Sequence, residues 1–312
     1  MAEAVSRLVH IVDDVPELED VEELTLVVAL SGFLDAGHAG ALAADHLQSL
    51  GDAPVVATFD VDVLYDYRAR RPAITFSQDH YEAYDAPRLV VRLVRDSGGT
   101  PFLLLRGPEP DFRWEAFCLA VRDVVERFGV TRVVSMGAVP MAVPHTRPRA
   151  VTHHANDPEL LTGASPWRSE IRVPTSVQAL LELRLGEWGH AALGYTVHIP
   201  HYLAQMDYPV ASISLLENLE IGGRMIVDLT GIRAKAAECD AEISTFLAEH
   251  AEVAEVVTAL EQQYDTFQRA ESTGASLLAS DEPLPTADDL GRQFEQFLAG
   301  LDGPPEGDQI QE

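Results

Sequence analysis

Lysine is almost missing from this sequence of 312 residues, which contains only Lys235. A Walker-type phosphate loop needs a lysine after its glycines and a protein kinase needs one on a strand, and neither pattern surrounds Lys235. A lysine Schiff base would have to form on the same residue, which lies in a charge-rich helical pattern without an apolar pocket sequence. The GxSxG elbow of serine hydrolases is absent as well. The sequence therefore carries none of these standard catalytic signatures.

Cysteine and long apolar runs are also scarce. Cys118 and Cys239 are the only cysteines and lie far apart, so we expect neither a disulfide framework nor a cysteine zinc site. No apolar run approaches the about 18 residues that a membrane helix needs. Residues 1–7 lack the basic start and the following apolar stretch of a signal peptide. We therefore predict a cytoplasmic protein that does not associate with a membrane.

Positive charge is the third deficit, because 22 Lys and Arg residues face 50 Asp and Glu residues, for a formal net charge of −28. Such a field repels the phosphates of nucleic acids and anionic membrane surfaces, so we expect neither as a partner. It favours solubility and basic partners. An acidic solvated surface explains the excess more simply than a specific acidic docking face, and both interpretations stay open.

Short β-branched apolar segments alternate with helical patterns through the first two thirds of the chain. The predicted strands are 25–30, 55–60, 89–94, 102–106, 132–136 and a weaker one at 195–199. The predicted helices are 36–50, 111–128 and 175–188, with Asp35 and Asp111 as N-caps of the first two. Apolar strands separated by helices imply an α/β fold with a largely parallel sheet covered on both faces. We assign this α/β core domain to residues 1–231.

From Ile232 onward the pattern changes to an apolar heptad repeat held for about five heptads. The heptad positions are Ile232, Ala236, Cys239, Ile243, Phe246, His250, Val253, Val257, Leu260, Tyr264 and Phe267. They predict one long helix, or two helices with a break near 249–251, whose apolar stripe is buried against the core, a sister helix or another subunit. We assign residues 232–300 to this helical C-terminal segment, with a short helix at 287–298, and residues 301–312 to a disordered tail.

Two turns that follow predicted strands carry candidate site residues. Residues 31–40 combine glycines with the start of a helix, which suits an anion, but Asp35 places a negative charge there, and helix capping explains the turn more simply. In residues 107–114, Glu109 and Arg113 are spaced to face each other, with Trp114 as a platform. A capped helix with a salt bridge and a buried indole explains this turn at least as well.

The segment 144–148 (PHTRP) follows the predicted strand 132–136. In an open parallel sheet, ligands bind outside the carboxyl ends of the strands. At such an end, His145 supplies an imidazole that can change its protonation state near neutral pH, and Thr146 supplies a hydroxyl group. Arg147 supplies a guanidinium group that can bind an anion through two N–H donors. Alternatively, Arg147 ties the loop to a carboxylate such as Glu109.

Another group of histidines lies around the predicted strand 195–199. His198 and His201 flank its end, next to Tyr202, and residues 153–154 are both histidine. Their spacing fits no zinc motif. We predict no metal and no cofactor.

Taken in order, these landmarks resemble the proteasome assembly chaperone 2 family, in its bacterial branch. The resemblance runs from about residue 24 to about residue 265 and rests on the motifs at 32–37, 60–72, 107–114, 137–138, 144–148 and 200–202. It implies a three-layer fold similar to that of purine nucleoside phosphorylases, with added C-terminal helices. It also implies a protein partner, since relatives in eukaryotes and archaea bind proteasome α-subunits. Some archaeal relatives dock through a C-terminal hydrophobic-Tyr-any motif, which is not matched here, because Gln311 stands where the tyrosine would be.

Three hypotheses follow. The first, which we favour, is a homo-oligomeric, chaperone-like protein, with a trimer as one option, that binds a protein partner such as a proteasome component and catalyses no reaction. The second is a small-molecule or anion-binding protein, or a hydrolase- or phosphorylase-like enzyme, with its cleft near residues 144–148. In the third hypothesis, the heptad repeat serves only to form oligomers. The candidate cleft residues are Asp35, Glu109, Arg113, Trp114, His145, Thr146, Arg147, His201 and Tyr202.

Overall fold

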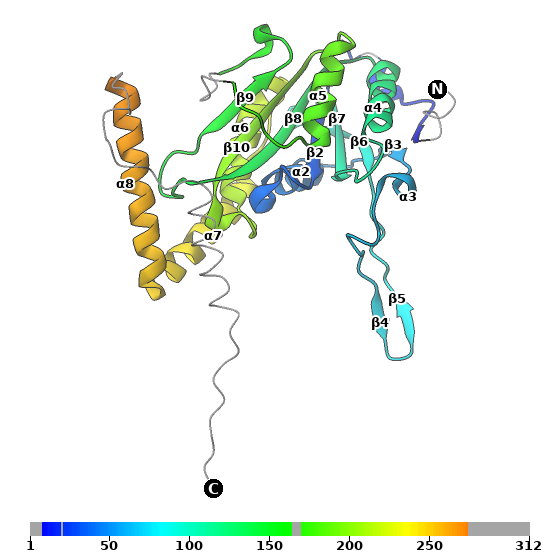
Figure 1. The fold of residues 1–312 in the computed structure, drawn as a ribbon. Helices are drawn as coiled ribbons and strands as arrows, with labels where there is room; N and C mark the ends of the chain where they lie inside the picture. The colour runs from blue at the N-terminus through cyan, green and yellow to red at the C-terminus, as the bar shows by residue number, and fades with distance from the viewer. Residues whose placement is uncertain (1–7, 20, 164–169, 274–312) are drawn as a thin grey trace. The chain divides into compact units, whose positions relative to one another are not determined.

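The computed structural model describes residues 8–19, 21–163 and 170–273 (Figure 1). Its centre is an eight-stranded sheet with the strand order β1-β3-β6-β7-β2-β8-β10-β9. The strands are β1 Val9–Ile11, β2 Leu24–Ser31, β3 Val55–Phe59, β6 Val90–Arg95, β7 Pro101–Pro108, β8 Val130–Met141, β9 Val151–Ala155 and β10 Ala192–Pro200. All six predicted strands are therefore present.

The middle of the sheet is parallel and its flanks are antiparallel. Strands β7, β2, β8 and β10 run in one direction. Strands β1, β3 and β6 on one flank and β9 on the other pair in antiparallel fashion. The predicted mixed α/β fold with a large central sheet is confirmed, and the parallel arrangement holds for the centre of that sheet. Strands β1 and β9 were not predicted, because β1 has three residues and β9 places polar residues at the edge of the sheet.

Burial on both faces explains why the central strands were visible in the sequence. In β2, Leu26 and Val28 belong to one buried apolar cluster, and Val27 and Ala29 belong to the other. Successive side chains of a strand point to opposite faces of the sheet. A strand covered on both faces must therefore be apolar at every position, which gives the continuous runs of Val, Leu and Ile.

Helices cover both faces of the sheet. Helices α2 (Ala39–Ser49), α6 (Pro209–Gly223) and α7 (Thr230–Glu249) contribute to the apolar cluster on one face. Helices α4 (Trp114–Phe128) and α5 (Val177–Glu187) contribute to the cluster on the other face. The three predicted helices correspond to α2, α4 and α5. Helix α6 was missed because most of its residues are buried, so it shows no amphipathic period.

Shorter elements connect these layers. They are the turns η1 Pro16–Leu18, η2 Ala36–His38, η3 Pro158–Leu160 and η4 His201–Leu203, and the one-turn helix α3 Val61–Leu64. The arrangement gives the expected helix–sheet–helix layers, and its likeness to purine nucleoside phosphorylases stays a prediction. Within the described residues, no helix is long and apolar enough to cross a membrane.

The heptad repeat forms two helices, α7 and α8 (Ala251–Thr273), separated at His250, whose backbone is non-helical. In α7, Ile232, Ala236, Cys239 and Ile243 are buried in the cluster that also contains α2 and α6. This half of the apolar stripe therefore packs within the subunit. By its internal contacts the chain divides into Met1–Tyr264 and Asp265–Glu312. The predicted domain boundary after residue 231 stays a prediction, and the segments 287–298 and 301–312 lie outside the described residues.

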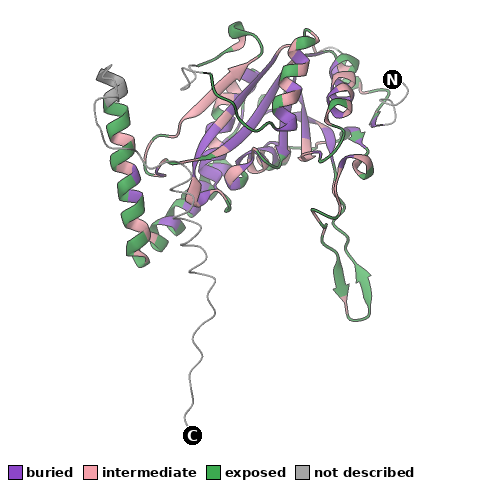
Figure 2. Cartoon of the chain, viewed as in Figure 1, coloured by how far each residue is buried: buried purple, intermediate pink, exposed green. Residues whose placement is uncertain are grey.

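A separate two-stranded ribbon lies between α3 and β6. Its strands are β4 Thr75–Ser77 and β5 His80–Glu82, which pair with each other and not with the main sheet. Figure 2 shows that this ribbon is exposed almost throughout, whereas the central strands are buried. The sequence analysis did not predict the ribbon, because a strand of three residues is too short to show the alternation of apolar and polar side chains.

Two positions on α7 test the packing of the heptad stripe. Ile243 is 6% exposed and Phe246, one turn further on, is 49% exposed. We expect Ile243→Ala to lower the free energy of unfolding by about 2–4 kcal/mol, because it leaves a cavity in the core. Phe246→Ala should lower it by less than about 1 kcal/mol. Urea denaturation of both variants measures the difference, and equal losses would contradict burial of α7 within the subunit.

Candidate functional site

All nine candidate residues lie in connections that leave the carboxyl ends of the four parallel strands. Asp35 follows β2, residues 109–114 follow β7, residues 145–147 follow β8, and residues 201–202 follow β10. The carboxyl ends of parallel neighbours lie at the same edge of a sheet, where ligands of open α/β sheets bind. We call this edge the carboxyl edge. Its use as a functional site stays a prediction, and the contacts of each residue show what it can contribute.

Glu109 holds two of these connections together. Its Oε2 atom accepts a hydrogen bond from the backbone N–H of Phe33 at 3.1 Å, and its Oε1 atom accepts one from Val177 at 2.7 Å. Val177 is the first residue of α5, so the carboxylate also lies at the positive end of that helix. A Cβ atom at Gly32 would lie 2.6 Å from Oε2 of Glu109, so the turn after β2 requires glycine.

In the turn of residues 109–114, the arginine that makes the contacts is not the predicted Arg113. Arg113 is exposed and has a left-handed backbone, with φ 58°, at the start of α4. The arginine bound at this turn is Arg70, which donates to the backbone oxygen of Glu109 at 2.7 Å and pairs with Asp111 at 2.5 Å. Asp111 thus binds Arg70 instead of capping α4, which corrects the predicted cap. The Trp114 indole donates to the backbone oxygen of Pro110 at 2.7 Å.

Asp35 is buried and binds the first turn of α2, although the N-cap position of that helix is His38 and not Asp35 as predicted. Its Oδ1 atom accepts hydrogen bonds from the backbone N–H groups of Gly40 at 2.8 Å and Ala41 at 3.3 Å, in the first turn of α2. Burial raises the pKa of Asp35 to about 6, and these two hydrogen bonds only partly oppose the shift. The carboxyl group of Asp35 is therefore poised to exchange a proton near neutral pH.

A pocket of 390 Å³ lies beside Asp35. Its lining residues are Ser31, Gly32, Phe33, Asp35, Ala36, His38, Pro140, Ala204 and Gln205. The connection after β2 meets the one after β10 here, since the N–H of Gly37 donates to the oxygen of Ala204 at 2.7 Å. His38 pairs with Asp207 at 2.7 Å across the same junction. Of the nine candidates, only Asp35 lines this pocket.

The connection after β8 binds to the one after β10. The backbone N–H of His145 donates to the Tyr202 hydroxyl oxygen at 2.9 Å, and Nδ1 of His145 lies 2.7 Å from the same oxygen. Burial raises the pKa of Tyr202 to about 12, so its hydroxyl stays protonated. Burial also lowers the pKa values of His145 and His201, which favours their neutral forms. The ring of His201 packs edge-on against Tyr202, 5.6 Å between centroids.

Residues 146–148 are tied to α8. Arg147 pairs with Glu261 at 3.3 Å, and the Thr146 hydroxyl donates to the same carboxylate oxygen. The Tyr264 hydroxyl donates to the backbone oxygen of Pro148 at 3.1 Å. The carboxylate bound by Arg147 is thus Glu261, whereas the alternative interpretation named Glu109. Apart from Asp35, the candidates form two groups. Residues 109–114 are held by Arg70 and α5, and residues 145–147 contact residues 201–202 and α8.

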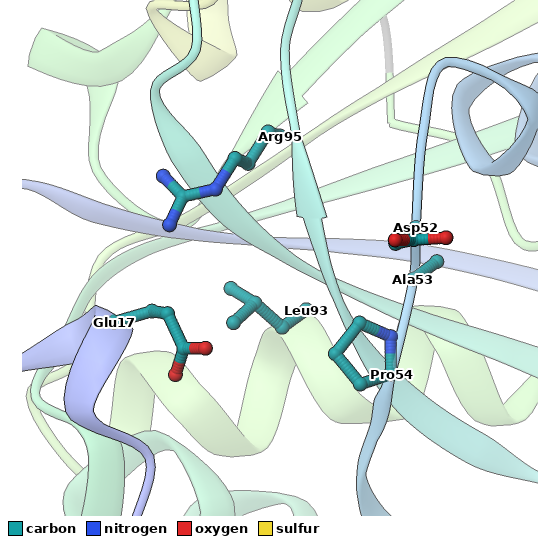
Figure 3. Close-up of a pocket in the computed structure, with 6 residues that line it drawn as sticks. All are labelled: Glu17, Asp52, Ala53, Pro54, Leu93 and Arg95. Carbon is teal, nitrogen blue, oxygen red and sulfur yellow. The ribbon is translucent and has the colours of Figure 1, made fainter.

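A larger pocket, of 560 Å³, lies at the opposite edge of the sheet, where β6 ends and β3 begins (Figure 3). It is lined by Glu17, Asp52, Ala53, Pro54, Leu93 and Arg95. The guanidinium group of Arg95 donates to the backbone oxygen of Gly99 at 3.0 Å. This pocket contains none of the candidate residues and lies away from the edge where open α/β sheets bind ligands.

His154 and His198, from the predicted group of histidines, have different partners. His154 binds Glu182 at 2.8 Å, and His198 lies 2.9 Å from the Thr152 hydroxyl. Within residues 8–19, 21–163 and 170–273, no group of three His, Cys, Asp or Glu side chains is arranged to hold a metal ion.

The model of the PAC2 family matches residues 29–247, which is more than half of the chain. The chain belongs to the PAC2 family. The match includes all nine candidate residues and most of α7, but not α8. A comparison with curated proteins gave no match.

Solved structures agree with this assignment of the PAC2 chain. A Mycobacterium tuberculosis protein of unknown function is 47% identical, with a TM-score of 0.82, covering 86% of this chain and 92% of its own. A Corynebacterium glutamicum protein of unknown function is 38% identical, with a TM-score of 0.79, over 83% and 97%. A proteasome-assembly chaperone homologue from M. tuberculosis is 29% identical, with a TM-score of 0.67, over 75% and 100%.

Asp35→Asn tests the protonation of the buried carboxyl group. Asparagine keeps an oxygen for the N–H groups of Gly40 and Ala41 but cannot titrate. The folded protein holds the proton of Asp35 more tightly than the unfolded chain, so this group's contribution to stability is lost as the pH rises from 3.8 to about 6. Between pH 4 and pH 7, we therefore expect the free energy of unfolding of the variant to rise by about 2–3 kcal/mol relative to the wild type. Urea denaturation at both pH values measures the change.

The control for this measurement is Asp52→Asn, because Asp52 is exposed and makes no ion pair within the described part of the chain. Asp52→Asn gives the effect of replacing one surface carboxylate by an amide, with which the change at Asp35 is compared. Parallel pH curves for Asp35→Asn and the wild type would contradict the assignment.

Glu261→Gln tests the attachment of residues 146–148 to α8. The glutamine keeps an oxygen for Thr146 but removes the charge that binds Arg147. We expect amide hydrogen exchange in a peptide covering residues 142–150 to increase by up to about fivefold, the range of a partly exposed ion pair. Glu255→Gln, an exposed site on the same helix, should leave the exchange unchanged. Equal exchange in the two variants would show that the ion pair does not hold the loop.

Proposed function

We propose that this PAC2 chain is a protein-binding, chaperone-like protein that acts as a homo-oligomer and recognises a proteasome component. The observation that carries the proposal is its similarity to the M. tuberculosis proteasome-assembly chaperone homologue, which is matched over its full length at 29% identity. The family match over residues 29–247 supports the same role.

The carboxyl edge has features of a recognition surface. Phe33 and Phe112 follow β2 and β7 and are 57% and 49% exposed, respectively. Exposed aromatic side chains are typical of protein interfaces, where they supply most of the binding free energy. The polar side chains around them are engaged within the fold, since Glu109 binds two N–H groups and Arg70 binds Asp111. This combination of rigid connections and exposed aromatic rings supports docking of a protein more than chemical turnover.

The alternative role, anion binding or phosphorylase-like catalysis near residues 144–148, has weaker support. Arg147, which was predicted to bind an anion, pairs with Glu261, so an anion would have to compete with that carboxylate. The net charge of −28 also opposes the approach of an anion. The same charge favours a protein partner with a basic docking surface.

Binding to proteasome α-subunits tests the proposal. Native mass spectrometry of the full-length chain mixed with 20S α-subunits from the same organism should show a complex. Phe33→Ser combined with Phe112→Ser should weaken the complex at least about tenfold, because two aromatic anchors are lost. Ile221→Ser is the control, because Ile221 is 63% exposed but lies near the end of α6. Absence of a complex under assembly conditions would refute the proteasome partner, and an unaffected double variant would refute this docking surface.

A further inference from the structure

The carboxyl group of Asp35 is buried but has one oxygen atom that the fold does not use. Asp35 is 7% exposed, and its Oδ1 atom accepts hydrogen bonds from the N–H groups of Gly40 and Ala41. Among the described residues, no donor binds its Oδ2 atom, which is not sealed within the core. Asp35 also lines the pocket of 390 Å³ at the carboxyl edge. Burying a carboxylate costs free energy unless its oxygens are bound, so the unused oxygen points to a ligand in this pocket.

The charge around the pocket favours a cation as that ligand. The first turn of a helix ordinarily attracts an anion, but Asp35 already binds the N–H groups of Gly40 and Ala41 and places its negative charge there. None of the described residues that line the pocket is lysine or arginine. The net charge of −28 acts in the same direction. An anion such as phosphate is therefore repelled, and a positively charged group is attracted.

The remaining lining residues fit a cation on an alkyl stem. Phe33 is 57% exposed and lines the pocket, and the face of an aromatic ring attracts ammonium and guanidinium groups. Ser31 and Gln205 supply side-chain oxygens that can accept N–H donors. Pro140 and Ala204 supply apolar surface, on which the methylene groups of a long basic side chain can pack. A buried carboxylate, an aromatic ring and an apolar wall together form a site for such a side chain.

The walls of the pocket are fixed before any ligand binds. The N–H of Gly37 donates to the oxygen of Ala204 at 2.7 Å, and the N–H of Tyr208 donates to the oxygen of Gly37 at 2.9 Å. Gly37 and His38 both have left-handed backbones, with φ 62° and φ 48°, and His38 pairs with Asp207 at 2.7 Å. Strained backbone of this kind is concentrated at functional sites. The connections after β2 and β10 therefore hold the pocket in one shape, which lowers the entropic cost of binding.

We propose that this pocket binds an alkylammonium or guanidinium group, with its N–H donors on Oδ2 of Asp35 and its positive charge beside the ring of Phe33. Such a group ends a lysine or arginine side chain of a protein partner, and it also ends a free polyamine. The proposal assigns a ligand class to the pocket and does not depend on recognition of a proteasome component.

Nuclear magnetic resonance of the ¹⁵N-labelled full-length chain measures binding of N-acetylargininamide at pH 7. The amide signals of Gly32, Phe33 and Gly40 should shift with a dissociation constant of about 1–10 mM, as expected for one charged group. N-acetylcitrullinamide has nearly the same shape without the charge and should bind at least about tenfold more weakly. Inorganic phosphate should leave these signals in place. Equal binding of the citrulline probe, or shifts caused by phosphate instead, would overturn the proposal.

Spermidine, measured in the same way, distinguishes the two sources of the cation. Tighter binding of spermidine than of N-acetylargininamide assigns the pocket to a free polyamine, and the reverse order assigns it to a side chain of a protein. If neither cation shifts the signals of residues 32–40, the pocket does not bind cations.

Two variants test the residues that carry the recognition. Asp35→Asn should raise the dissociation constant of N-acetylargininamide at least about tenfold, because the charged acceptor is lost. Phe33→Leu should raise it about threefold, because leucine keeps the apolar contact without the aromatic face. The matched controls are Asp52→Asn and Phe112→Leu, which change an exposed carboxylate and an exposed ring outside this pocket and should leave binding unchanged. Wild-type affinity in Asp35→Asn would refute Asp35 as the acceptor.

The affinity should also depend on pH through Asp35. His38 and Asp207 are the other titratable groups that act on this carboxyl group. Burial raises the pKa of Asp35 to about 6, so the group is mostly neutral at pH 5, and we expect a dissociation constant about tenfold larger there than at pH 7.

His38→Asn separates the contribution of Asp35 to this pH dependence from that of His38. Asparagine tolerates the left-handed backbone of position 38 and removes the imidazole. The tenfold change should persist in this variant, and its disappearance would assign the pH dependence to His38 and contradict the role of Asp35. All of these measurements use the chain without α-subunits, so their failure and the failure of the proposed function are distinguished.

Discussion

Burial of the four parallel strands on both faces is the constraint on which the rest of the structure depends. Parallel neighbours need long crossover connections, so helices must cover both faces of the sheet. The connections after β2, β7, β8 and β10 then emerge at the same edge. Residues far apart in the sequence, such as Asp35 and His201, reach this edge because of the strand order. The concentration of polar residues there is first a consequence of topology.

Many polar side chains at this edge stabilise the connections themselves. Glu109 satisfies the N–H groups of Phe33 and Val177, and Tyr202 satisfies that of His145. A hydrogen bond within a protein contributes about 0.5–1.5 kcal/mol to stability, and somewhat more when one partner is charged, so these bonds together favour one conformation of the turns. Rigid turns lower the entropic cost of binding a partner, because little ordering is left to occur on association. The same bonds reduce the freedom of these groups to transfer protons or bind anions.

The parts of the fold that were predicted are those with a local signal. The central strands are continuous apolar runs, Asp35 accepts a hydrogen bond in the first turn of α2, and α4 ends at Gly129, which has a left-handed backbone. Helix α6 lacked such a signal because it is buried on nearly all sides. The β4–β5 ribbon lacked one because its strands have three residues each.

The candidate site was predicted only in part, for a related reason. The positions of its residues at the carboxyl edge follow from the alternation of strands and helices, and this was visible in the sequence. Their partners were not visible, because Arg147 and Glu261 are 114 residues apart and the path of the chain brings them together. Arg70 likewise reaches the oxygen of Glu109 through an unpredicted connection, 39 residues away. Side-chain type and spacing predict where a residue lies more reliably than what it binds.

The heptad repeat shows the same limit in another form, because one continuous pattern has two structural outcomes. The heptad positions Ile232, Ala236, Cys239 and Ile243 are buried in the core of the subunit, whereas Phe246 and Phe267 are exposed. A heptad pattern specifies that a stripe is apolar but not what covers it. In an acidic chain, exposed apolar residues beside unpaired carboxylates are unfavourable sites for association with most of the chain's own surface, since like charges repel. A surface that covers the exposed part of this stripe must therefore carry basic residues around its own apolar side chains, so the charge beside the stripe limits what can cover it.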